Sequence, residues 1–150
     1  MKKHDIDLAI VQRDDLISPQ PKNSRQLTGG VFDVILFLHQ LEYLDESEEV
    51  LPVLKRLLRP GGFVLIQTLV NQAMDRKYDK IVSDEDRDRL KEFMKPGVKR
   101  VFGSDLQKTL SKAGFMVETI DYGSRLGSAA VQYYQLGKGQ HELIYKCKKP

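Results

Sequence analysis

The chain has 150 residues, of which 41% are hydrophobic and 30% charged, a composition typical of one globular domain rather than a disordered segment. Its 24 basic and 21 acidic residues leave a net charge of +3, too small a surplus to predict nucleic-acid binding. No apolar run approaches the roughly 20 residues that cross a membrane, and the opening lysines lack the apolar stretch of a secretory signal. Because a single cysteine excludes an intramolecular disulfide and the three histidines lack metal-ligand spacing, we predict a cytoplasmic protein without a metal site.

The first half of the chain contains two apolar runs of strand length. Residues 6–11 predict a short strand whose carboxyl end carries Asp14 and Asp15 into a loop, and residues 18–30 are rich in proline, glycine and polar side chains. Residues 32–38 are almost continuously apolar. This pattern indicates a strand covered on both faces, as in a parallel sheet.

A helix and a second buried strand are predicted next. Asp45 and Ser47 are candidate helix N-caps, and the apolar residues that follow recur at helical spacing: Val50, Leu51, Leu54, Leu57 and Leu58. Pro52 should kink the helix or delay its start, and the Pro-Gly-Gly sequence at 60–62 should end it. Residues 63–68 then form a strand, so the segment reads as a βαβ unit with parallel strands.

The C-terminal third predicts one helix and a closing pair of strands. Residues 104–107 have the pattern of a capping box, and Gly114 supplies a left-handed helix stop. Residues 115–120 and 142–148 alternate between apolar and polar side chains. The highly charged residues 71–100 are interpreted as a solvated helix or lid.

Three pieces of sequence carry a family resemblance: Phe-Asp-Val-Ile-Leu at 32–36, His-x-Leu-Glu at 39–42, and Leu-Leu-Arg-Pro-Gly-Gly at 57–62. In this order and spacing they resemble the small-molecule branch of class I S-adenosylmethionine-dependent methyltransferases. Residues 100–120 are similar to the last helix and sixth strand of that family, and residues 139–148 to its seventh strand.

The resemblance implies an α/β fold: a partial Rossmann-like, three-layer sandwich with a mostly parallel sheet and a C-terminal antiparallel strand pair. One truncated domain would span residues 1–150. The family strand order 3-2-1-4-5-7-6 would place strand 32–38 beside strand 63–68, with the C-terminal pair beyond. Since ligands of open α/β sheets bind beyond the carboxyl ends of the strands, the site is expected there.

The resemblance also assigns roles to single residues. Asp14, with the backbone amide of Asp15, matches the position that hydrogen-bonds the adenine of S-adenosylmethionine. Leu38 and His39 match the positions beside the methionine part and the methyl group, and His39 is the candidate general base. Alternatively, Asp14 and Asp15 belong to a solvated loop, and His39 is a capping or packed histidine.

The chain departs from the family before Asp14, where thirteen residues contain no glycine. The first strand with its glycine-rich turn and the second strand are therefore expected to be missing, and the cofactor is expected to bind weakly or not at all. Without those strands, residues 32–38 would be an exposed sheet edge. Residues 6–11 or a second copy of the chain would pair with it, which makes a homo-oligomer one expected assembly.

The leading functional hypothesis is methyl transfer from S-adenosylmethionine to an unidentified small-molecule or glycan-type acceptor, impaired in this chain alone. The alternative is a non-catalytic methyltransferase remnant that acts as a binding or regulatory partner. Residues 70–100 and 121–140 would select the acceptor.

Several other side chains are interpreted as structural. Glu42 is interpreted as a solvated or helix-start charge and Cys147 as a small apolar filler. The tyrosines at 43, 133, 134 and 145 are interpreted as packing at the rim of the site.

Overall fold

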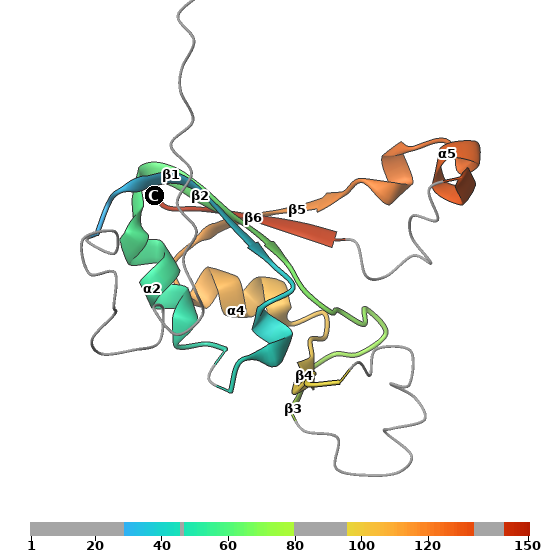
Figure 1. Ribbon diagram of the computed structural model, residues 1–150, viewed down its shortest axis with the longest axis horizontal. Coiled ribbons are helices and arrows are strands. Elements are labelled where there is room, and N and C mark those ends of the chain that lie inside the picture. The colour runs from blue at the N-terminus through green and yellow to red at the C-terminus, as the bar shows by residue number, and fades with distance from the viewer. Residues whose placement is uncertain (1–28, 46, 80–95, 134–142) are drawn as a thin grey trace, which may run out of the picture.

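A computed structural model describes residues 29–45, 47–79, 96–133 and 143–150. The predicted strand at 6–11 and the candidate adenine ligands Asp14 and Asp15 lie outside these residues. The described elements, in chain order, are β1 (Phe32–Leu38), the 3₁₀ helix η1 (Leu41–Tyr43), α2 (Val50–Leu57), β2 (Leu58–Gln67), β3 (Tyr78–Asp79), β4 (Arg100–Val101), α4 (Leu106–Lys112), β5 (Met116–Asp121), the 3₁₀ helix η2 (Gly123–Arg125), α5 (Ser128–Tyr133) and β6 (Leu143–Lys148) (Figure 1).

Four strands form one sheet in the order β1-β2-β6-β5. β1 pairs with β2 in parallel, and β6 runs antiparallel to both β2 and β5. The order and the C-terminal antiparallel pair are those that the sequence predicted. The expectation of a mostly parallel sheet is not met in the described residues, because β6 lies between β2 and β5 and opposes both, so two of the three neighbouring pairs are antiparallel.

The βαβ unit is present with a shorter helix than predicted. α2 begins at Val50 and buries its apolar stripe of Val50, Leu51, Leu54 and Leu57. Pro52 is the third residue of α2, in the first turn, where backbone N–H groups have no partner within the helix, so its missing N–H breaks no helical hydrogen bond. The N-cap is Glu49 without a side-chain cap, so the predicted caps Asp45 and Ser47 are wrong.

The Pro-Gly-Gly sequence lies inside the bounds of β2 rather than between a helix and a strand. Phe32 pairs with Leu58 and Val34 with Phe63, so residues 59–62 form an irregular bulge opposite Asp33 alone. A Cβ atom on Gly62 would lie 2.9 Å from the backbone oxygen of Asp33, so only glycine fits this approach of the two strands.

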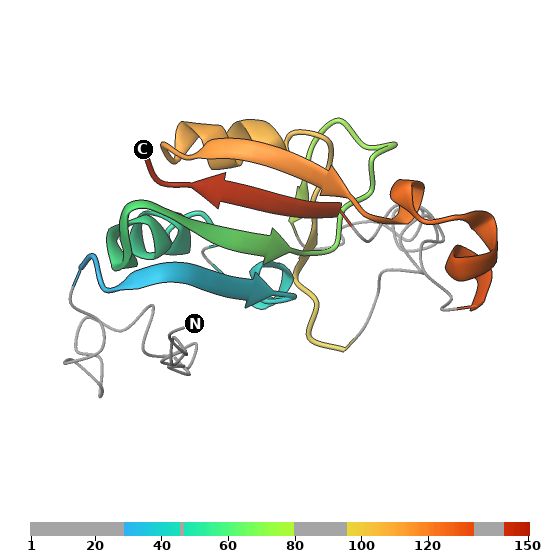
Figure 2. The same ribbon diagram turned by 90° about the horizontal axis from the view of Figure 1, so that it is seen from above.

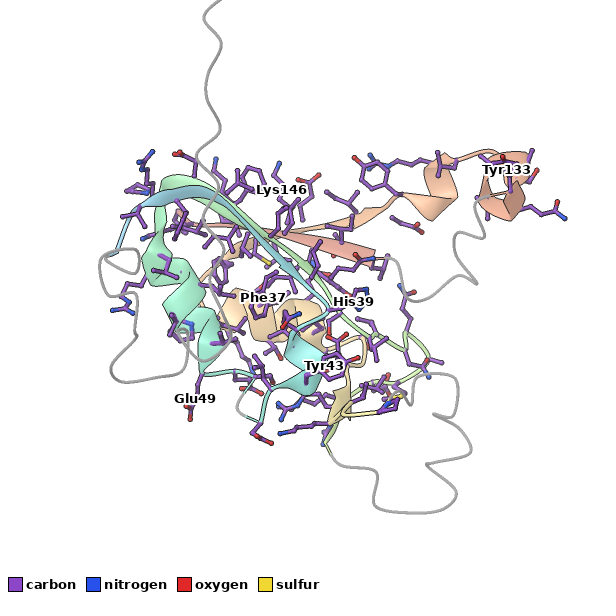
Figure 3. The ribbon with its side chains drawn as sticks, in the orientation of Figure 1. Phe37, His39, Tyr43, Glu49, Tyr133 and Lys146 are labelled. Atoms are coloured by element: carbon purple, nitrogen blue, oxygen red, sulfur yellow. The ribbon has the colours of Figure 1, made fainter. Side chains whose placement is uncertain are left out.

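The described helices α2 and α4 lie on the same face of the sheet (Figures 1 and 2). Phe37 lies on this covered side and Lys146 on the other (Figure 3). The core fills the space between the sheet and these helices, with fully buried side chains that include Val50, Leu54, Leu58, Val64, Ile66, Leu106, Leu110 and Cys147. The described part of the chain therefore supplies two of the three layers that the resemblance implied.

The opposite face of the sheet, which we call the open face, carries apolar side chains that remain exposed. Val34, Leu36 and Leu38 alternate along β1, and Leu36 is 63% exposed. Leu36 is paired with Leu65 on β2. The Lys146 Nζ atom lies 5.2 Å from the centre of the Phe63 ring on the same face. The prediction that β1 is buried on both faces is thus wrong for the described residues, because the described helices cover one face alone.

The C-terminal helix and the charged segment differ in detail from the predictions. α4 has Asp105 at its N-cap without a side-chain hydrogen bond, so the predicted capping box is wrong, whereas Gly114 ends the helix with a φ of +87° as predicted. Within the region interpreted as a lid, β3 and β4 pair antiparallel. No helix among the described residues is long and apolar enough to cross a membrane.

Candidate active site at the carboxyl end of β1

The backbone turns sharply where β1 ends. His39 has a φ of +51° and is the one non-glycine residue with a positive φ in the described part of the chain. Its backbone N–H donates to the Gln67 carbonyl over 2.7 Å, which extends the β1–β2 ladder by one step before η1 begins. A left-handed conformation costs about 1–2 kcal/mol for a residue with a Cβ, and such strain is concentrated at functional sites.

A chain of hydrogen bonds joins the carboxyl ends of both parallel strands. His39 Nδ1 lies 2.9 Å from Glu42 Oε1, and the Thr68 hydroxyl donates to Glu42 Oε2 over 2.7 Å. Glu42 is 1% exposed and Thr68 is fully buried, whereas the His39 side chain is 48% exposed. The result is an imidazole at the surface backed by a buried carboxylate with both oxygens engaged.

Glu42 was interpreted as a solvated or helix-start charge. It does lie in the first turn of η1, but it is not solvated, because its side chain is buried. Leu41 next to it is also buried, so η1 is anchored by its apolar side chain and turns Glu42 inward toward Thr68. The backbone N–H of Lys99 donates to the Glu42 carbonyl, which fixes η1 from the side of β4. The signal available in the sequence was the spacing of His39 and Glu42, which are three residues apart and so can meet where the chain makes a single turn.

Charged side chains tie the loop between η1 and α2 to the strands β3 and β4. The buried Arg100 guanidinium donates to Ser47 Oγ and to the Asp45 carbonyl, and Lys99 pairs with the Asp45 carboxylate. Lys77 donates to Glu48 over 2.5 Å, and this hydrogen bond lowers the pKa of the Glu48 carboxyl group. These contacts fix the loop between η1 and α2. Sequence analysis missed the burial of Arg100 because it assigned this region to a solvated lid.

Leu38 is the last residue of β1 and is 43% exposed, and His39 is the next residue along the chain, at the end of the strand (Figure 3). The other candidate ligands, Asp14 and Asp15, lie outside the described residues. No group of three or more histidine, cysteine, aspartate or glutamate side chains that could hold a metal ion occurs within the described ranges.

The tyrosines divide into different environments. Tyr43 on η1 is half-buried, and Tyr133 on α5 is largely exposed, away from the sheet (Figure 3). Tyr145 on β6 is buried in the core, so the interpretation of this residue as rim packing is wrong. Tyr134 lies outside the described residues. Cys147 is fully buried on the same strand as Tyr145, which confirms its assignment as an apolar filler.

Residues 13–66, which contain β1, the His39 turn, α2 and nearly all of β2, match the sequence model of the methyltransferase domain family. The strand order β1-β2-β6-β5 is the one that the resemblance to this family predicted. The fold is that of a class I methyltransferase. No curated protein is similar enough in sequence to count as a match.

Solved structures share this methyltransferase fold at low sequence identity. An S-adenosylmethionine-dependent methyltransferase from Mesorhizobium loti has 18% identity and a TM-score of 0.56, with 81% of this chain and 63% of that chain covered. The [4+2]-cyclase SpnF has 20% identity and a TM-score of 0.50, with coverages of 81% and 51%. A chain in the complex of the Haloferax volcanii Trm112 methyltransferase activator with the putative methyltransferase has 15% identity and a TM-score of 0.51, with coverages of 83% and 56%.

This chain spans less than two thirds of the length of each of these three proteins. At such identities the likeness establishes the fold alone. That one of the similar structures is a cyclase also illustrates that this fold does not dictate a single chemistry.

Proposed function

We propose that the chain takes part in methyl transfer from S-adenosylmethionine to a small-molecule or glycan-type acceptor, at the rim formed by Leu38 and His39. The observation that carries this proposal is the half-exposed, strained His39 at the carboxyl end of β1, inside the segment that matches the methyltransferase family. In open α/β sheets, this end of the strands is where ligands bind.

The residues at the rim fit one part of the cofactor. The exposed Leu38 side chain offers an apolar surface to the methylene groups of the methionine part, and the His39 ring, from the next residue along the chain, offers a proton acceptor. Asp14 and Asp15 remain the proposed adenine ligands. When bound, S-adenosylmethionine supplies a methyl group attached to a positively charged sulfur.

His39 is the proposed general base. Methyl transfer requires an acceptor oxygen or nitrogen held in line with the methyl carbon, so positioning contributes most to the rate. A neutral imidazole at the rim would take up the proton that the acceptor loses. Proton transfer by a positioned side chain contributes about 10²–10⁴-fold to such reactions.

Calorimetry of the full chain with S-adenosylhomocysteine tests this proposal. We expect binding in the micromolar to millimolar range, and Leu38→Ala should weaken it by about ten-fold, or about 1.4 kcal/mol. Leu36→Ala is the matched control, because Leu36 is also exposed on the open face but lies back from the rim. Its affinity should equal that of the wild type.

Equal weakening by the two substitutions would contradict the placement of the cofactor at Leu38. No binding at millimolar ligand would instead favour the alternative, a non-catalytic partner of another protein. The similar structure that contains the Trm112 activator gives one example of a methyltransferase-fold protein described in a complex with an activator.

We also propose that the free edge of β1 pairs with a second copy of the chain. Among the described residues β1 has a strand neighbour on one side only, and Val34, Leu36 and Leu38 are exposed beside that edge. An apolar edge with unpaired backbone groups favours pairing with another chain. In hydrogen exchange at a concentration that gives dimers by sedimentation, the outward amides within 33–37 should be protected; rapid exchange there would contradict the pairing.

A further inference from the structure

The His39 ring contacts the buried carboxylate of Glu42. An ionised carboxylate accepts hydrogen bonds and donates none, so the 2.9 Å contact between Nδ1 and Oε1 requires the proton to lie on Nδ1. The second oxygen of Glu42 is already engaged by the Thr68 hydroxyl. A neutral imidazole with its proton on Nδ1 has one remaining acceptor, Nε2.

We propose that Glu42 and Thr68 are positioning residues that hold His39 as the Nδ1-protonated tautomer, with Nε2 as its acceptor atom. The contribution of Glu42 and Thr68 to catalysis rests on the proposed function, in which His39 Nε2 would receive the proton that the methyl acceptor loses. The tautomer itself is a property of the chain and does not depend on that function.

The three residues come from three elements that the sheet brings together. His39 follows β1, Thr68 follows β2, and Glu42 lies on η1. The backbone of His39 is fixed independently, because its N–H donates to Gln67 and its φ is +51°. The ring is thus held at its backbone and at Nδ1.

Thr68 has a role distinct from that of Glu42. A buried carboxylate is costly unless it is hydrogen-bonded, and hydrogen bonds to the charged form favour that form. The Thr68 hydroxyl provides such a bond from the end of β2, 26 residues along the chain from Glu42. Removing this hydroxyl should therefore loosen the carboxylate that orients the ring.

The test is nuclear magnetic resonance of the full chain with ¹⁵N-labelled histidine, at a pH at which imidazoles are neutral. The His39 signals are assigned by their loss in His39→Gln, which separates them from His4 and His141. We expect the Nδ1-protonated tautomer to dominate by roughly ten-fold, the effect of one hydrogen bond to a charged group. A dominant Nε2-protonated ring in the wild type would overturn the proposal.

Four variants separate positioning from a merely structural role. Glu42→Leu and Thr68→Val should shift the tautomer ratio toward Nε2 protonation. Thr68→Ser keeps the hydroxyl and should retain the wild-type ratio. Glu42→Gln keeps a carbonyl oxygen for Nδ1 but loses the charge, so the Nδ1-protonated tautomer should remain favoured by a smaller ratio. If the first pair fails to fold, the wild-type spectrum and the conservative pair still decide the question, because loss of the Nδ1 tautomer in Thr68→Ser would count against the proposal.

The two proposals can fail separately. An Nδ1-protonated His39 in a chain that does not bind S-adenosylhomocysteine would contradict the proposed function and leave the positioning intact. A chain that binds S-adenosylhomocysteine but whose His39 shows no preference for the Nδ1-protonated tautomer would contradict the positioning alone.

Discussion

Replacing Leu110 by alanine is expected to lower the free energy of unfolding by about 2–5 kcal/mol, the range found when a buried leucine is truncated. Leu110 on α4 is fully buried in the core between the helices and the sheet. The substitution removes apolar contacts and leaves a cavity that a close-packed interior fills only in part. Because a domain of this kind has a total stability of about 5–15 kcal/mol, the loss should be a large fraction of the whole and easily measured.

Urea denaturation followed by circular dichroism measures this effect. Leu126→Ala is the matched control, because Leu126 follows η2 and is exposed, and its truncation should change the free energy of unfolding by less than about 0.5 kcal/mol. Equal losses in the two variants would show that α4 does not pack on the sheet as described.

The parts of the fold that sequence predicts are those set by local patterns. The continuous apolar run at 32–38 predicts a strand beside a parallel neighbour, and the helical spacing from Val50 to Leu57 predicts α2 with its buried stripe. The strand order came from the resemblance of the motifs rather than from any single pattern. Each of these signals is contained within a short stretch of chain.

The parts that sequence missed depend on contacts between distant residues. From the sequence alone, Glu42 is indistinguishable from a surface charge. Its hydrogen-bond partners Thr68 and His39 are brought beside it only by the parallel pairing of β1 and β2. The bulge at 59–62 arises because β2 must stay in register with β1 on both sides of Asp33. Arg100 is buried because the loop before α2 supplies acceptors that local sequence does not reveal.

The Cys147 thiol is expected to react about 10³-fold more slowly with a thiol reagent in the folded chain than in the urea-unfolded chain at pH 8. Burial raises the pKa of Cys147 from 9.0 to about 12. The nucleophile is the thiolate, and a shift of three pKa units lowers its fraction by about 10³-fold. Because the chain has one cysteine, the rate of labelling reports on this position alone.

The labelling control moves the thiol by one residue along β6. Lys148 is exposed, so Lys148→Cys in a Cys147→Ala background should react at nearly the rate of the unfolded chain. A reaction of native Cys147 within ten-fold of the unfolded rate would contradict its burial between the sheet and the helices.

The raised pKa of Cys147 also predicts how the free energy of unfolding depends on pH in the alkaline range. Burial, with a smaller contribution from the nearby Cys147, raises the pKa of Tyr145 from 10.0 to about 12. In both residues the folded state retains the proton to a higher pH than the unfolded state does. Their contribution to stability is therefore complete below about pH 9 and is lost progressively as the pH rises toward 12. In urea titrations Cys147→Ala should reduce the part of this loss that begins near pH 9, whereas an unchanged pH profile would show that the thiol does not titrate with folding.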